Sequence, residues 1–407
     1  LRSPNSGLTL NEPIAPVPGK CPIWSENTND IFADLKDGAK VLVQGASSSP
    51  SSLISLLYQH VMEKGLKKIT VNHFHPLGPL PYLNEEAKDN FRLNTCYSTN
   101  LCRDAINTGR ADFTPISVSE IPLFYRSGRG ETDYALITVT PPDKHGFCSL
   151  GAAVGTVRSA IQNAKKIIGK SFSVMMAILL GQVNPMAPTT YGDGTIHCSN
   201  IDYFVHGPQM LHQIPPPKTN VTEQKIAKII AENLVEDGAT IQLGFGRIPY
   251  EVANQLRGHR DLGVHAEMFS DGIVDLVNLG VVNNRKKTVR RGRIVASYTI
   301  GTEKVFDFIN ENPLVALYDI AWVNSIEVIA RNPKVTAVNT AFEIDLTGQC
   351  ASDSLGNSIF TGVGGHIDFT RGASLSIDGR GRPIITMCSK NSAGNSAIVP
   401  FLTDGSG

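Results

Sequence analysis

The chain has 407 residues, of which 41% are hydrophobic and 18% are charged, a globular rather than a disordered composition. Its 37 basic and 37 acidic side chains give a formal net charge of zero, which argues against a nucleic-acid-binding protein with its usual basic excess. The length exceeds one ordinary hydrophobic core and predicts about two domains.

Seven cysteines are scattered along the chain, and no two of them form a CxxC pair. This pattern argues against a disulfide framework or a zinc knuckle and favours a reducing compartment. We therefore expect an intracellular location, in the cytoplasm or the mitochondrial matrix. The most apolar run, residues 171–181, is too short to span a bilayer, so no membrane partner is expected. The chain begins with Leu1 rather than Met, which is compatible with a preceding segment.

Two segments begin alike, residues 37–57 (DGAKVLVQGASSSPSSLISLL) and residues 237–256 (DGATIQLGFGRIPYEVANQL). Each has Asp-Gly-Ala, a short apolar strand, a glycine and then a proline five residues later, where proline favours the first turn of a helix. The pairing predicts two related α/β halves. Further strand-like runs fit open, largely parallel sheets: 133–141, 334–346 and 383–388.

The segment 206–220 is the best linker, because three consecutive prolines cannot continue a helix or a central strand. It predicts an N-terminal domain of residues 1–214 and a C-terminal domain of residues 215–407. A helix should follow, with Asn220 as its N-cap and Glu223 completing a capping box. Its apolar residues recur at helical spacing: Ile226, Ile229, Ile230 and Leu234.

The glycines Gly244 and Gly246 follow a predicted strand and precede a predicted helix, so their turn exposes backbone amides suited to an anion. Half of a dinucleotide-binding fingerprint is present, and Glu267 falls near the position of a ribose-binding acid. However, Pro249 replaces the third glycine, which weakens this NAD interpretation. A plain structural turn is the other alternative.

Glu267 lies in the stretch HAEMFSDG, just ahead of a predicted helix that Ser270 caps and Gly280 ends. The apolar face of this helix is expected to point to the core: Ile273, Val274 and Val277. A carboxylate near a helix N-terminus stays ionised easily, and it can attack an acyl carbon to form an anhydride. A surface turn acid remains the simpler reading of Glu267 taken alone.

A third glycine cluster, in residues 360–373, contains Gly362, Gly364 and Gly365. Backbone amides that no side chain blocks can form an oxyanion hole for acyl transfer. Sharp turns use the same residues, so the cluster by itself leaves both interpretations open.

Other segments carry weaker signals. The HFH stretch, 73–75, predicts two histidines on one face of a strand, solvated or hydrogen-bonded rather than metal-binding. The basic stretch 283–293 is expected to form an exposed hairpin or turn that could help to hold a phosphate. No GxSxG, Walker A or HExxH pattern occurs, so those hydrolase, NTPase and metalloprotease mechanisms have no support.

Taken together, seven segments in order resemble the acetyl-CoA hydrolase/transferase family, near its 4-hydroxybutyrate and acetate CoA-transferases. They cover nearly the whole chain: ADFTPISVSEIP (111–122), TPPDKHGFCSLG (140–151), QVNPMAPTTYGDGTIH (182–197), GFGRIP (244–249), HAEMFSDGIVDL (265–276), AVNTAFEIDLTGQ (337–349) and GVGGHIDFTRGA (362–373). The resemblance implies two related open α/β domains of the CoA-transferase type, with the active site between them.

The resemblance also implies ping-pong transfer of CoA through a glutamyl-CoA thioester, with Glu267 as the glutamate. The amides of Phe245 and Gly364 are implied as oxyanion donors. Coenzyme A is implied as a substrate, without a metal or redox cofactor, and family members are often homo-oligomers. The positions implied to contact CoA are Gly244, Phe245, Gly246, Arg247, Ile248, Asn324, Gly364, Gly365 and Lys390.

The chain departs from the family pattern at three places. Residues 169–181 look like an insertion, Thr189 stands where many members have arginine, and the chain ends where relatives continue with a further segment. An acetyl-CoA hydrolase, a catalytically inactive acyl-CoA-binding relative and an NAD-linked enzyme are the competing functions. Among acceptor acids, acetate, propionate, butyrate, 4-hydroxybutyrate and succinate are all open.

Overall fold

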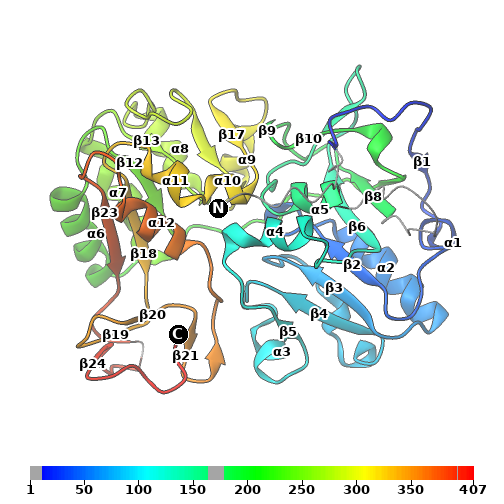
Figure 1. Ribbon diagram of the computed structural model, residues 1–407, viewed down its shortest axis with the longest axis horizontal. Coiled ribbons are helices and arrows are strands. Elements are labelled where there is room, and N and C mark those ends of the chain that lie inside the picture. The colour runs from blue at the N-terminus through cyan, green and yellow to red at the C-terminus, as the bar shows by residue number, and fades with distance from the viewer. Residues whose placement is uncertain (1–11, 164–177, 392) are drawn as a thin grey trace.

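The structure is a computed structural model that describes residues 12–163, 178–391 and 393–407. It consists of two α/β lobes that lie side by side, the N-terminal half on the right and the C-terminal half on the left of Figure 1. This arrangement confirms the predicted fold class. Most of the expected insertion, 169–177, lies outside the described residues, and its last four residues belong to strand β8 (Ile178–Val183).

The N-terminal half is built on one sheet of eight strands, in the order β1-β11-β8-β6-β2-β3-β4-β5, in which every neighbouring pair is parallel. All six residues of the central strand β6 are buried, because a parallel sheet is covered on both faces. Besides β8, the strands of this sheet are β1 (Ile23–Trp24), β2 (Lys40–Val43), β3 (Ile69–His73), β4 (Phe91–Thr95), β5 (Asp112–Phe113), β6 (Tyr134–Val139) and β11 (Tyr203–His206).

Helices and 3-10 turns connect these strands. The predicted unit of strand, glycine loop and helix is confirmed by β2, the 3-10 turn η1 (Ala46–Ser48) and α2. Gly45 is required in this loop, because a Cβ there would lie 1.6 Å from the carbonyl oxygen of Phe74. The helices of this half are α1 (Thr28–Ile31), α2 (Ser51–Lys64), α3 (Arg103–Asn107), α4 (Ile121–Arg126) and α5 (Val157–Asn163).

The C-terminal half is built on a second parallel sheet, in the order β13-β12-β18-β23. The second predicted unit is confirmed, since β12 leads through the glycine loop into α7. The strands are β12 (Thr240–Leu243), β13 (Gly263–Val264), β18 (Thr336–Thr340) and β23 (Arg382–Thr386). The helices are α6 (Val221–Leu234), α7 (Arg247–Gln255), α8 (Asp271–Asn278), α9 (Glu303–Ile309), α10 (Ile320–Val323), α11 (Ile326–Ala330) and α12 (His366–Ser374).

The predicted capping box of α6 is confirmed in both of its hydrogen bonds. The Asn220 side chain accepts from the Glu223 amide at 3.0 Å, and the Glu223 carboxylate accepts from the Asn220 amide at 2.7 Å. Ile230 is buried as the apolar spacing indicates, whereas Ile229 points outward and is 59% exposed. Successive side chains of a helix point about 100° apart, so two adjacent isoleucines cannot both point to the centre of the core.

Several short sheets join the lobes and extend the C-terminal half. Strand β9 comes before the linker but pairs with β17, so one strand of the N-terminal half belongs to a sheet of the other half. The division at residues 214 and 215 stays a prediction. The short strands are β7 (Phe147–Ser149), β9 (Tyr191–Gly192), β10 (Thr195–His197), β14 (Met268–Phe269), β15 (Ile294–Ala296), β16 (Tyr298–Thr299), β17 (Val315–Leu317), β19 (Glu343–Asp345), β20 (Cys350–Ala351), β21 (Ser354–Leu355), β22 (Ser358–Ile359) and β24 (Ile398–Val399).

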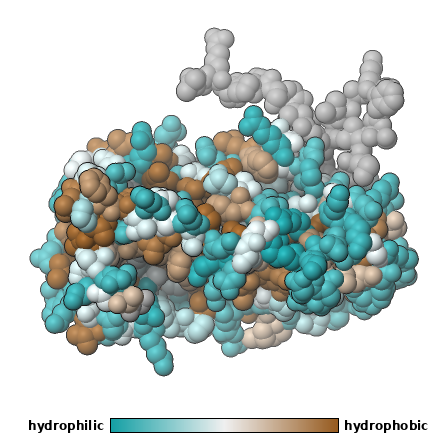
Figure 2. Space-filling view, turned by 90° about the horizontal axis from the view of Figure 1, so that it is seen from below, coloured by the Kyte–Doolittle hydropathy of each residue, from teal (hydrophilic) through white to brown (hydrophobic). Residues whose placement is uncertain are grey.

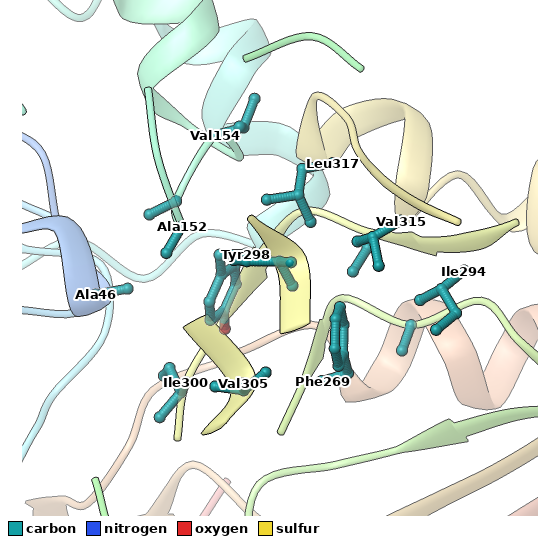
Figure 3. Close-up of a cluster of buried hydrophobic side chains, with 14 of the residues drawn as sticks. Ala46, Ala152, Val154, Phe269, Ile294, Tyr298, Ile300, Val305, Val315 and Leu317 are labelled. Atoms are coloured by element: carbon teal, nitrogen blue, oxygen red, sulfur yellow. The ribbon is translucent and has the colours of Figure 1, made fainter. Parts of the chain in front are cut away.

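The largest hydrophobic core is shared by the two halves. Figure 3 shows Ala46, Ala152 and Val154 of the N-terminal half beside Tyr298 and Leu317 of the C-terminal half. Backbone hydrogen bonds cross the same junction, from the amide of Thr299 to the carbonyl of Ala152 and from the amide of Val154 to the carbonyl of Ser297. These two bonds measure 2.9 and 3.1 Å. The lobes are therefore fixed to each other by packing and by backbone contacts.

The basic stretch 283–293 differs from its prediction as an exposed turn. Its turn geometry is present, but Lys287 is 0% exposed and donates from Nζ to the carbonyls of Val264 and Arg293, at 2.6 and 2.7 Å. The same side chain fills the space beside Gly263, where a Cβ would lie 2.5 Å from it. Lys287 thus anchors the end of β13 instead of facing a phosphate.

The surface of the C-terminal half is the more apolar one in Figure 2, where hydrophobic side chains gather on the left of the molecule. Its most exposed large apolar residues include Phe401 at 79%, Leu346 at 76% and Ile377 at 71%.

Within the described ranges, no helix is long and apolar enough to cross a membrane. The expected homo-oligomer stays a prediction.

Candidate active site

A cavity of about 860 Å³ lies between the two halves and contains Glu267. The N-terminal half contributes the segments that follow β3 and β4 and the start of α3. The C-terminal half contributes the glycine loop after β12, the Glu267 segment and the glycine cluster before α12. The lining residues that matter below are His75, Tyr97, Arg103, Gly244, Phe245, Gly246, Glu267, Tyr298, Gly364 and Gly365.

Glu267 lies between β13 and β14, at the end of the strand that pairs with β12. The side chain is half-buried, and each carboxylate oxygen accepts one hydrogen bond. The Tyr298 hydroxyl donates to Oε1 at 2.8 Å, and Nδ2 of Asn324 donates to Oε2 at 2.8 Å. Two fixed donors from different elements hold the carboxylate in one orientation within the cavity.

Burial raises the pKa of Glu267 above its ordinary value. The hydrogen bonds from Asn324 and Tyr298 lower this pKa in part, and the nearby carboxylate of Asp368 raises it again. The expectation that the following helix favours the ionised form of Glu267 is not met, because its pKa lies above rather than below the ordinary value. Helix α8 begins only at Asp271, and desolvation has the largest effect on the carboxylate.

Ser270 occupies the N-cap position of α8 as predicted, but its side chain makes no capping hydrogen bond. Asp271 instead accepts from the amide and hydroxyl of Thr302, at 3.0 and 2.7 Å, and ties α8 to the start of α9. Ile273 and Val274 are buried as predicted.

Gly365 lies directly against the nucleophile candidate. A Cβ at this position would be 1.8 Å from Oε2 of Glu267 and 2.4 Å from Nδ2 of Asn324, although its φ of −108° suits any residue. Gly364 is required for a different reason, because its φ is +61°. Gly362 has a φ of +101° and would in addition clash with the ring of Phe113. The glycine cluster thus permits close approach and left-handed backbone at adjacent positions.

The loop of Gly244, Phe245 and Gly246 forms the facing part of the cavity wall. A Cβ at Gly244 would lie 2.6 Å from the side-chain oxygen of Asn339, and Gly246 has a φ of +145°. The amides of Phe245 and Gly364 have no acceptor within the part of the chain that the structure describes. Two free amides in the cavity that holds Glu267 are available as oxyanion donors, a role that stays a prediction.

The remaining predicted CoA contacts fall into three environments. Asn324 is 0% exposed and contacts Glu267 and Asp368, with 3.2 Å to the latter, so the structure shows it as a support of the carboxylate. Arg247 is exposed, lies 3.5 Å from Glu223 and lines a smaller apolar cavity of about 190 Å³ beside the glycine loop. Ile248 is buried in the core, and Lys390 is exposed and lines neither cavity. Their contacts with CoA stay predictions.

The dinucleotide alternative matches the strand order, because β13 is the neighbour of β12 and Glu267 follows β13. However, both carboxylate oxygens of Glu267 already accept hydrogen bonds from protein side chains. Pro249 is the third residue of α7, as its predicted place in the first turn requires. The geometry therefore favours a held reactive carboxylate over a ribose ligand.

The HFH prediction is right about hydrogen bonding for His73, and it is wrong about strand geometry. His73 ends β3 and bonds to the hydroxyls of Tyr82 and Ser49, at 2.7 and 3.2 Å. His75 lies beyond the strand with a φ of +49° and enters the cavity wall. Across the described residues, no group of three metal-ligating side chains forms a metal site.

Two residues around Glu267 were missed by sequence reasoning, Tyr298 and Asp368, and His75 was considered only as part of the HFH stretch. Asp368 accepts from Asn324 and from the Ser119 hydroxyl at 3.0 Å, and burial raises its pKa to about 6. Asp368 belongs to the segment that contains the glycine cluster, so its place in that motif was the available signal. Tyr298 lies in a short buried strand and carries no such signal.

Comparison with known proteins places both halves in one family. The N-terminal domain of acetyl-CoA hydrolase/transferase matches residues 24–216, and its C-terminal domain matches residues 301–407. A succinyl-CoA:acetate/propanoyl-CoA:succinate CoA transferase of Fasciola hepatica is 49% identical over 97% of this chain and 80% of its own length. A 4-hydroxybutyrate coenzyme A transferase of Clostridium kluyveri is 37% identical over 91% of this chain and 83% of its own length.

Solved structures agree with this assignment. The crystal structure of RipA from Yersinia pestis superposes with a TM-score of 0.83 at 27% identity, over 93% of this chain and 85% of that one. A 4-hydroxybutyrate CoA-transferase from Porphyromonas gingivalis superposes with a TM-score of 0.74 at 28% identity, over 93% and 84% of the two chains. The chain therefore belongs to the acetyl-CoA hydrolase/transferase family and is an enzyme of the CoA-transferase type.

Proposed function

We propose that this protein moves CoA between a short-chain acyl-CoA and a carboxylic acid by a ping-pong mechanism, with Glu267 as the nucleophile. The observation that carries the proposal is the placement of Glu267, half-buried in a cavity between the lobes and held by Tyr298 and Asn324. Relatives that act on succinyl-CoA, acetate, propanoyl-CoA and 4-hydroxybutyrate support the substrate class.

In the first half-reaction, the Glu267 carboxylate attacks the thioester carbonyl, and the amides of Phe245 and Gly364 stabilise the oxyanion. The C–S bond breaks, CoA leaves as the thiolate, and a glutamyl-acyl anhydride remains. The thiolate then attacks the glutamyl carbonyl, which forms the glutamyl-CoA thioester and releases the first acid as a carboxylate. A second carboxylate attacks this thioester, and the same steps run in reverse.

The environment of Glu267 fits these steps. Burial raises its pKa, which makes the ionised carboxylate a stronger nucleophile than one in water. Oε1 and Oε2 are each oriented by one donor, so attack requires little rearrangement of the side chain. A tight fit against Gly365 limits the carboxylate to this position. Contacts with the rest of the CoA molecule supply binding energy for the reaction.

The proposal is tested by trapping the thioester. Incubation with acetyl-CoA followed by borohydride should reduce Glu267 to the alcohol, which mass spectrometry locates in the Glu267 peptide. Glu267→Ala should abolish transfer and retain CoA binding in calorimetry. The exposed Glu303, on α9, provides the matched control, because Glu303→Ala also removes one acidic side chain.

Three results would decide against the proposal. A folded protein that transfers CoA without modification of Glu267 would remove the nucleophile from the mechanism. CoA release that does not depend on an added acid would identify an acetyl-CoA hydrolase. CoA binding without turnover on any acid would identify an inactive acyl-CoA-binding relative.

A further inference from the structure

Three hydrogen-bond donors in the N-terminal half face the cavity without an acceptor. They are the ring of His75, the hydroxyl of Tyr97 and the terminal amino groups of Arg103. Within residues 12–163, 178–391 and 393–407, none of these groups meets an acceptor. Three donors without a protein acceptor in one wall of the cavity are available to pair with a polar ligand.

His75 is fixed in a strained position. Its φ of +49° is uncommon for a residue with a side chain, and the ring stacks on Tyr97 at 4.7 Å between centroids. It also makes edge contacts with Phe245 and Tyr298, at 6.4 and 6.0 Å. These contacts tie the ring to both halves of the active site and hold it at the cavity.

The two ring nitrogens of His75 have different surroundings. Nδ1 is buried without a partner, whereas Nε2 is the nitrogen that the cavity can reach. Burial lowers the pKa of His75 to about 4, so the ring is neutral at neutral pH. An unpaired N–H costs more than an unpaired lone pair, which favours the tautomer with its proton on Nε2. His75 thus offers one donor to the cavity.

Arg103 is a cation whose charge is not neutralised. Its guanidinium lies 3.8 Å from the centroid of the Phe360 ring, and Nε donates to the Phe360 carbonyl at 2.9 Å. No carboxylate lies within ion-pair distance of it in the described ranges of the chain, although twelve other ion pairs are present there. The guanidinium is oriented, and its two terminal amino groups are left for an anion.

Tyr97 lies near the two charged groups of the cavity, Glu267 and Arg103. Burial raises its pKa, so the hydroxyl stays protonated and can donate. The carboxylate of Glu267 raises this pKa further, and the positive charge of Arg103 lowers it. The hydroxyl therefore lies within the electrostatic reach of both Glu267 and Arg103.

We propose that Arg103, Tyr97 and His75 bind the distal carboxylate of a dicarboxylic acid whose other carboxyl group exchanges CoA with Glu267. This inference rests on the proposed function and narrows its substrate class. One guanidinium matches one carboxylate in charge, and two neutral donors supply its remaining hydrogen bonds. A monocarboxylic acid with an alkyl chain leaves all three donors unpaired and binds less well for that reason.

The acceptor preference of three variants tests the inference, with acetyl-CoA as the donor and succinate, butyrate and isotopically labelled acetate as acceptors, because transfer to unlabelled acetate only regenerates acetyl-CoA. Arg103→Met should lower kcat/KM for succinate roughly 10- to 100-fold, because it removes a charged hydrogen bond. Tyr97→Phe removes only a hydroxyl and should lower the same value roughly fivefold. Both variants should lower kcat/KM for succinate at least about threefold more than kcat/KM for labelled acetate. Arg129→Met is the matched control, since Arg129 is exposed in the same half and lines neither cavity.

Each contrary result has a distinct meaning. A higher KM for acetyl-CoA in Arg103→Met, with equal losses for succinate and acetate, would show that Arg103 binds a phosphate of CoA and would overturn the inference. Unchanged succinate kinetics in both variants would overturn it as well. A wild-type protein that uses acetate but not succinate would overturn the inference and leave the proposed function intact. A wild-type protein that uses no acid would overturn both.

Discussion

Replacing Gly365 by alanine tests whether Glu267, the proposed nucleophile, depends on the close approach of the backbone at that position. The added Cβ would lie 1.8 Å from Oε2 of Glu267, which is about 1.6 Å short of ordinary contact at 3.4 Å. Either the carboxylate or the start of α12 has to move by that distance. A displacement of about 1 Å at the reacting group lowers activity roughly 100-fold, so we expect at least this loss in kcat/KM.

The comparison with Gly364→Ala separates this effect from backbone strain. Gly364 has a φ of +61°, and a Cβ there meets only the Gly362 carbonyl at 3.8 Å. Gly364→Ala should therefore cost about 1–2 kcal/mol of unfolding free energy but keep Glu267 open to the acetyl-CoA and borohydride labelling. Gly365→Ala should lose that labelling. The reasoning is refuted if folded Gly365→Ala retains transfer within threefold of the wild type.

Three further perturbations have expected outcomes. Tyr298→Phe removes a hydrogen bond that lowers the pKa of Glu267, so this pKa should rise. The acid limb of the pH–rate profile should then move to higher pH, and kcat should be lower by roughly tenfold. An acid limb at the wild-type pH would contradict the effect of the Tyr298–Glu267 hydrogen bond. Burial lowers the pKa of Lys287 in the folded protein to about 7. Between about pH 7 and 10 the unfolded state therefore binds more protons than the folded state. In urea unfolding, the free energy of unfolding of the wild type should rise with pH in this range by up to about 1.4 kcal/mol per pH unit. Lys287→Met should abolish this rise, and an equal slope in both proteins would contradict the buried position. Asn220→Ala should lower the free energy of unfolding by about 1 kcal/mol through loss of the α6 cap, and no change in urea unfolding would argue against it.

Features that depend on neighbouring residues could be predicted from the sequence. The capping box of Asn220 and Glu223 spans one helical turn, and the glycine loops were visible because backbone geometry itself demands glycine there. The partners of Glu267 could not be predicted in this way. Tyr298 and Asn324 are 31 and 57 residues away in sequence, and only the packed sheets bring their polar atoms to the carboxylate.

Two mispredictions have the same physical origin. Periodicity placed both histidines of the HFH stretch on a strand, but β3 ends at His73 and the left-handed backbone of His75 turns its ring into the cavity. Charge placed Lys287 at the surface, but two backbone carbonyls receive its ammonium group inside the protein. Local patterns describe average environments, whereas these side chains meet acceptors or space that distant segments provide.

The junction between the lobes limits how the enzyme can move during turnover. Tyr298 contributes its ring to the shared core and its hydroxyl to Glu267, and the backbone of the same segment is bonded to the N-terminal half. A hinge motion that separated the lobes would break the backbone bonds and remove the N-terminal half from the ring of Tyr298, whose hydroxyl positions the carboxylate of Glu267. We therefore expect the lobes to stay together as a rigid body, with substrate exchange through local movement of the cavity loops. Limited proteolysis at the linker should then leave the two fragments associated.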